Sequence, residues 1–84
     1  MTEQRNAVLF RMVLPNHTCP YGIRAKSLLE QAGYEVEDHI LRSRDEVDAF
    51  LDAEGVSETP QVFIGNARIG GSDEVENYLM INQS

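Results

Sequence analysis

The chain has 84 residues, a single cysteine and a formal net charge of −7. This acidic balance disfavours nucleic acid and anionic lipid as partners. No stretch approaches the roughly 20 apolar residues of a membrane span, and residues 1–5 lack the apolar region of a signal peptide, so we expect a cytoplasmic protein with no membrane partner. A lone cysteine excludes an internal disulfide, so any disulfide chemistry must be intermolecular. The length suits one domain over residues 1–84 with a single small core.

The first half of the chain alternates strand-like and helix-like patterns. Residues 7–14 are almost all apolar and predict a strand buried on both faces, ended by a turn at residues 15–16. From Pro20 onward, apolar residues recur at helical spacing as far as Gly33, which is typical of a helix stop. Residues 34–41 then alternate apolar and charged side chains, which predicts a half-exposed second strand.

The second half continues the alternation. A capping-box spacing at residues 43–46 predicts a short helix that ends at Gly55. Residues 61–64 and 67–69 predict two short strands joined by a hairpin turn at Gly65-Asn66. A final helix follows them. The element order is therefore βαβαββα in one α/β domain with four strands.

Cys19 lies where the first strand gives way to the first helix, in the sequence Cys19-Pro20-Tyr21-Gly22. A thiolate at a helix N-terminus faces unpaired N–H groups and the positive end of the helix dipole, which favour its ionised form. Pro20 suits the first helical position, because its missing N–H would be unpaired there anyway. The alternative is a buried, inert cysteine, the commoner fate of a lone Cys. The polar residues before Cys19 favour the reactive thiol.

Two further segments could contribute to a site around Cys19. Thr59-Pro60 precedes a predicted strand, where Pro60 either ends a loop or adopts the cis form. A cis Pro60 would leave the backbone of Thr59 free to pair with an extended peptide. At residues 70–73, Ser72 or Asp73 can cap the final helix while exposed N–H groups bind a carboxylate, although such a sequence is also ordinary for a helix start.

These three motifs occur together and in the order seen in glutaredoxins, and the chain resembles that family over nearly its whole length. The resemblance implies a thioredoxin-like α/β fold with a four-stranded mixed sheet of order 2-1-3-4, the first two strands parallel, and helices on both faces. It also implies a glutathione-dependent thiol-disulfide oxidoreductase that serves redox homeostasis and electron transfer. Glutathione would be the co-substrate, and glutathionylated or disulfide-bonded proteins the partners. By the same resemblance Cys19 is the nucleophile, and the glutathione-binding residues are Tyr21, Thr59, Pro60, Gly71, Ser72 and Asp73.

The departures from the family pattern bear on the mechanism. Gly22 stands where most members carry a second cysteine, so the chemistry would be monothiol, through Cys19 alone. Asn16 replaces the usual lysine before the cysteine, and Glu58 adds a negative charge beside Thr59-Pro60, so both would weaken activity. The bases that could replace the lysine, or that could simply be solvated surface charges, are Arg24, Lys26, Arg42 and Arg44.

Two other functions remain open at this point. A carrier of a two-iron, two-sulfur cluster would hold it as a dimer, through Cys19 and a bound glutathione from each chain, whereas the oxidoreductase would be a monomer with no metal ligand. The missing second cysteine favours the carrier. Pro20 and Tyr21 favour the oxidoreductase, and only residues 15–18 separate the first strand from Cys19, whereas carriers have extra residues there. A glutathione-binding adaptor without turnover is the third alternative.

Overall fold

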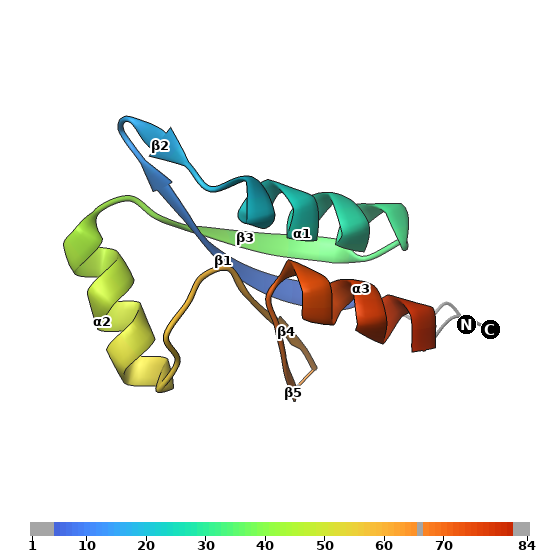
Figure 1. Cartoon of the computed structure of the whole chain (residues 1–84). Helices are drawn as coiled ribbons and strands as arrows, with labels where there is room; N and C mark the ends of the chain where they lie inside the picture. Colours follow the sequence, from blue (N-terminus) through green and yellow to red (C-terminus); the bar gives the residue numbers. More distant parts are fainter. Residues whose placement is uncertain (1–4, 66, 82–84) are drawn as a thin grey trace.

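The computed structural model describes residues 5–65 and 67–81 (Figure 1). The predicted order of helices and strands is confirmed, with one short strand added. No helix in these residues is long and apolar enough to cross a membrane. The elements are β1 (Asn6–Leu14), β2 (His17–Thr18), α1 (Pro20–Gln31), β3 (Glu35–Leu41), α2 (Arg44–Glu54), β4 (Gln61–Ile64), β5 (Ala67–Gly70) and α3 (Ser72–Ile81).

The sheet is mixed, with β1 at its centre. β1 pairs in parallel with β3 from Asn6 to Met12, and antiparallel with β4 from Ala7 to Phe10. β4 pairs antiparallel with β5. The order β3-β1-β4-β5 is the predicted 2-1-3-4 order when the short strand β2 is left out of the count.

The expectation of four strands was wrong. Residues 17–18, which were expected to belong to an irregular connection before Cys19, form the additional strand β2. His17 and Thr18 pair antiparallel with Leu14 and Val13, so β1 and β2 form a hairpin that projects past the start of α1 (Figure 1). The pairing of β1 with β4 ends at Phe10 and its pairing with β3 ends at Met12, so the last two residues of β1 are left for β2 to pair with. An unpaired strand edge of this kind readily accepts another strand.

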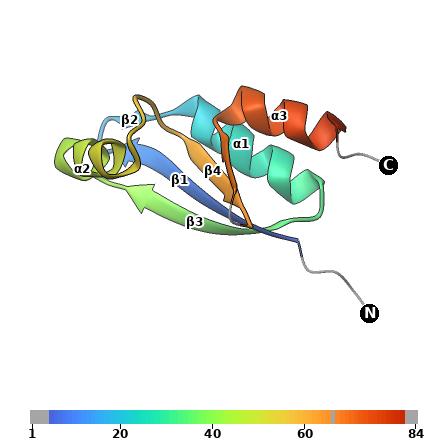
Figure 2. The same cartoon turned by 90° about the horizontal axis from the view of Figure 1, so that it is seen from below.

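Helices α1 and α3 lie side by side on one face of the sheet (Figure 2). The core between these helices and the sheet contains fully buried aliphatic side chains from each layer, including Leu9 of β1, Leu29 of α1, Val62 of β4 and Val75 of α3. Burying one such side chain stabilises the fold by about 1.5–3 kcal/mol. This shared core fixes the first turn of α1 relative to the start of α3.

Helix α2 covers the opposite face, as successive strand residues point to opposite sides of a sheet. Phe10 follows Leu9 on β1 and stacks on Phe50 of α2 with ring centroids 4.6 Å apart. Phe63 of β4 meets Phe10 edge-on at 5.9 Å. The prediction of helices on both faces is therefore confirmed.

The predicted start of α2 and the predicted stops are also present. The Ser43 Oγ accepts a hydrogen bond from the Glu46 N–H at 3.1 Å, as the capping box predicts. Gly55 ends α2 with a φ of 67°, a left-handed conformation that glycine adopts without a steric penalty. Gly65 has a φ of 62° at the turn between β4 and β5, and Asn66, the other residue predicted for this turn, lies outside the described residues.

Candidate functional site

Cys19 is the N-cap residue of α1, with extended backbone angles of φ −70° and ψ 119°. Pro20 is the first helical residue, as predicted, and the Gly22 N–H donates to the Cys19 carbonyl at 3.2 Å. The thiol is free and half-buried, and it makes no capping hydrogen bond. The structure thus places Cys19 at the helix N-terminus on which the prediction of a reactive thiol rests, and the reactivity itself stays a prediction.

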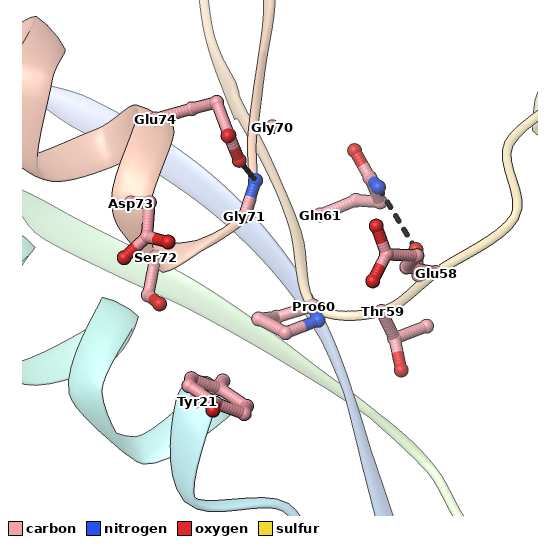
Figure 3. A pocket seen from close by; sticks show the side chains of 10 residues that line it. All are labelled: Tyr21, Glu58, Thr59, Pro60, Gln61, Gly70, Gly71, Ser72, Asp73 and Glu74. Carbon is pink, nitrogen blue, oxygen red and sulfur yellow. Dashed lines mark hydrogen bonds between the residues drawn. The ribbon is translucent and has the colours of Figure 1, made fainter.

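A groove of about 360 Å³ lies next to this helix start (Figure 3). Its volume is in the range of sites for small organic molecules, about 300–1,000 Å³. Three segments form it: the first turn of α1, the loop before β4, and the junction between β5 and α3. All six predicted glutathione-binding residues line the groove together with four others, so the lining is Tyr21, Glu58, Thr59, Pro60, Gln61, Gly70, Gly71, Ser72, Asp73 and Glu74.

The loop before β4 settles one alternative that the sequence left open. The Thr59–Pro60 peptide bond is cis, which is the form that we required for backbone pairing with a ligand. Pro60 is buried, and the Gln61 side chain donates to the Glu58 carbonyl at 2.8 Å across the turn. This hydrogen bond fixes the path of the chain as it enters β4.

The start of α3 is capped differently from the prediction. Neither Ser72 nor Asp73 is the cap. Instead, the Glu74 carboxylate accepts a hydrogen bond from the Gly71 N–H at 2.8 Å. A side chain at Gly70 would collide with Glu74, because an added Cβ would lie 2.9 Å from its Cγ, so the glycine is needed for this cap. The sequence analysis missed Glu74, although a glutamate three residues after a helix N-cap is a known capping signal.

The charges of the groove are strongly unbalanced. Glu58, Asp73 and Glu74 line it, and none of the lining residues is basic. Arg24 reaches its edge: Nη1 lies 3.3 Å from Asp73 Oδ1, and Nη2 lies 3.0 Å from Glu76 Oε1.

The other predicted replacements for the missing lysine do not line the groove. Lys26 pairs with Asp38 of β3 at 3.5 Å, and the Arg44 guanidinium donates to the Met12 sulfur. Asn16, in the turn between β1 and β2, is exposed and is not part of the groove lining either.

Gly22, in the place of a second cysteine, is buried against Arg11 of β1. A Cβ added at Gly22 would lie 2.8 Å from the Arg11 Cβ and 3.2 Å from its Cδ. Arg11 is itself held by Asp38, with Nε donating to Oδ1 and Nη2 donating to Oδ2, each at 2.9 Å. These hydrogen bonds lower the pKa of Asp38 and raise that of Arg11. The ion pair therefore packs directly beneath the first turn of α1.

The βαβαββα order, the cysteine at the start of the first helix and the cis proline before β4 together define a protein of the thioredoxin-like class. The family model for glutaredoxins matches residues 7–69. Glutaredoxin 1 of Rickettsia typhi is 38% identical over 63 residues, covering 71% of this chain and 61% of the relative. A glutaredoxin of Pseudomonas aeruginosa is 38% identical over 58 residues, covering 68% and 69% respectively. The chain belongs to the glutaredoxin family.

Other matches extend this result. Hybrid peroxiredoxin hyPrx5 of Haemophilus influenzae is 40% identical over 61 residues, but the match spans only 25% of that protein's length. The crystal structure of glutaredoxin 1 from Francisella tularensis, complexed with cacodylate, shares the fold with a TM-score of 0.78 and 22% identity, over 94% of this chain and 99% of the other. A buckwheat glutaredoxin–glutathione complex has a TM-score of 0.74 and 29% identity, over 94% and 72%.

Proposed function

We propose that the protein is a glutathione-dependent thiol-disulfide oxidoreductase that reduces mixed disulfides between proteins and glutathione by a monothiol mechanism. The observation that carries the proposal is the groove, in which the cis Pro60 and the start of α3 face the helix turn that begins at Cys19. The buckwheat glutaredoxin of the same fold was solved with glutathione, which supports glutathione as the ligand here.

The proposed reaction has two thiol–disulfide exchanges. The Cys19 thiolate attacks the glutathionyl sulfur, the disulfide to the substrate breaks, and the substrate leaves as a thiolate that takes up a proton. The thiolate of a second glutathione then attacks the glutathionyl sulfur on Cys19, which releases oxidised glutathione and the Cys19 thiolate. The helix N-terminus assists mainly in the second step, because a stabilised thiolate is a better leaving group.

The lining residues have distinct roles in this proposal. The Thr59 backbone pairs with the cysteinyl part of glutathione, and Tyr21 forms a wall of the groove. The Ser72 N–H binds the carboxylate of the γ-glutamyl group, and Asp73 binds its ammonium group. Gly71 joins β5 to α3 in the groove lining, and an added Cβ there would lie 3.3 Å from Glu74 Oε1 and in ordinary contact with the Pro60 carbonyl at 3.5 Å.

The same lining predicts weak binding. Glutathione carries a net negative charge, and the groove presents three carboxylates to it. A lost charged hydrogen bond to the glycyl carboxylate, with Asn16 in place of lysine, costs about 1.5–3 kcal/mol of binding free energy. We therefore expect a high KM for glutathionylated substrates, whose glutathionyl part binds in the groove.

The test is the reduction of a glutathionylated peptide by the purified protein and glutathione, with Cys19→Ser as the control. We expect turnover that is abolished in Cys19→Ser, because that variant has no thiol. Absence of turnover in the intact, folded protein would contradict the proposal. Circular dichroism of both proteins would verify that they are folded.

A second function, transport of a two-iron, two-sulfur cluster, is favoured by the β1–β2 hairpin. Residues 11–18, which end β1 and form the hairpin, separate the part of β1 that pairs with β4 from Cys19, although only residues 15–18 follow β1 itself. Within residues 5–65 and 67–81, no group of three His, Cys, Asp or Glu side chains could hold a metal ion. A cluster would thus require Cys19 from two chains together with glutathione.

Anaerobic incubation with iron, sulfide and glutathione would test the carrier function. Visible absorption of a cluster, together with a dimer in size-exclusion chromatography, both absent in Cys19→Ser, would support it. A colourless monomer would refute it. A cytoplasmic location stays a prediction.

A further inference from the structure

The side chain of Arg24 extends from α1 to α3 at the edge of the groove. Of the basic side chains in the described part of the chain, only Arg24 forms an ion pair with a residue that lines the groove. Its partner Asp73 is 82% exposed, so its carboxylate is accessible to a ligand. The second partner, Glu76, lies one helical turn further along α3 and lines no part of the groove.

The two contacts of Arg24 differ in length. The Nη2–Glu76 distance is 3.0 Å, whereas the Nη1–Asp73 distance is 3.3 Å. A guanidinium has five N–H donors in a fixed planar arrangement. Glu76 can therefore keep the guanidinium oriented toward α3 while the Nη1 donors exchange Asp73 for another acceptor.

We propose that Arg24 and Asp73 together recognise the zwitterionic α-amino acid end of a γ-glutamyl thiol, with Asp73 binding the ammonium and Arg24 binding the carboxylate. The inference rests on the proposed function and adds a specificity-determining residue to it. The ammonium and carboxylate of this group are attached to the same carbon. A ligand whose ammonium replaces Arg24 at Asp73 thus brings its carboxylate beside the Nη1 donors that have been released.

The negative charge of the groove makes it selective for the position of a ligand carboxylate. Glu58 and Glu74 repel a ligand carboxylate, so a carboxylate is tolerated only where positive potential is available. Arg24 and the N-terminus of α3 provide it at the same end of the groove. A thiol without the free α-amino acid end would be bound neither by Arg24 nor by the N-terminus of α3.

The experiment compares glutathione with its analogue 4-aminobutyryl-cysteinyl-glycine, which lacks the α-carboxylate and keeps the ammonium. We would measure KM and kcat for the peptide mixed disulfides of both thiols with the wild-type protein and Arg24→Gln, because the thiol joined to the peptide is the one that occupies the groove. Arg68→Gln is the matched control, because it removes the same charge from an exposed arginine outside the groove lining. Thermal unfolding would show that both variants fold.

We expect Arg24→Gln to raise the KM for the glutathionylated peptide about two- to fivefold at unchanged kcat, as for an exposed charged contact. The KM for the mixed disulfide of the analogue should not change, and Arg68→Gln should leave both values unaltered. An equal change for the mixed disulfides of both thiols, or a lower KM for the glutathionylated peptide in Arg24→Gln, would overturn the inference, the latter by showing that Arg24 only competes for Asp73.

The failure of this inference is distinguishable from the failure of the proposed function. If the wild-type protein does not turn over glutathione, the oxidoreductase proposal fails. Binding of S-methylglutathione to the wild-type protein and to Arg24→Gln, measured by calorimetry, would then still test the role of Arg24. Equal affinities would refute it.

Discussion

Replacing Gly22 with alanine should destabilise the protein, although the same change usually stabilises a helix. Glycine to alanine in a helix interior gains about 0.5–1 kcal/mol. Here the new Cβ would lie 2.8 Å from the Arg11 Cβ, which the β1 backbone fixes, and 3.2 Å from the Arg11 Cδ, which the ion pair with Asp38 holds in place. The first turn of α1 must therefore move away from β1.

The magnitude follows from these two opposing effects. Overpacking a well-packed site costs about 1–3 kcal/mol. After the helix-forming gain, Gly22→Ala should lower the free energy of unfolding by roughly 0.5–2 kcal/mol. For a domain of this size, each 1 kcal/mol lowers the Tm by about 4–8 °C.

Urea and thermal unfolding would measure this effect, with Glu30→Ala as the control on the exposed side of the same helix. The control should stay within about 0.5 kcal/mol of the wild type. Gly22→Cys should be destabilised at least as much as Gly22→Ala. A Gly22→Ala protein as stable as the wild type, or more so, would refute the argument that Arg11 closes this site.

Two further predictions concern ionised groups. Because its ion pair with Arg11 lowers the pKa of Asp38, this carboxylate stabilises the fold above its unfolded-state pKa, and the stabilisation is lost as the pH falls through the lowered value. Asp38→Asn should thus lose less stability than the wild type in urea unfolding between pH 5 and pH 2, and parallel losses would contradict this. Glu74→Gln should lower the KM for a glutathionylated peptide about threefold, since it removes one carboxylate from the groove. The Gln oxygen can still accept from the Gly71 N–H, so a raised KM in the turnover assay would show that the Glu74 charge does not repel the ligand.

The sequence was sufficient for features that depend on local patterns. Alternation and helical spacing predicted the elements, and the three motifs predicted six of the ten residues that line the groove. Strand β2 was missed because two residues are too short to carry a periodic signal. Its pairing depends on how far β1 extends beyond β4.

The contacts between elements depend on packing and were not predictable in the same way. The parallel register of β1 and β3 pairs Leu9 with Asp38 and Arg11 with Ile40. Arg11 and Asp38 therefore lie diagonally opposite each other on the same face of the sheet. Arg24 meets Asp73 because α1 and α3 pack side by side. Neither the register nor the helix packing can be deduced from one segment alone.

The close approach of Gly22 to Arg11 also bears on the evolution of this chain. A single change of Gly22 to cysteine would press the new side chain against β1, so a two-cysteine site here would come with a loss of stability. Removing Arg11 to make room would leave Asp38 without its bidentate partner in a partly buried position. A cysteine at position 22 would therefore require compensating changes in β1, and chains that keep this ion pair should keep glycine at this position.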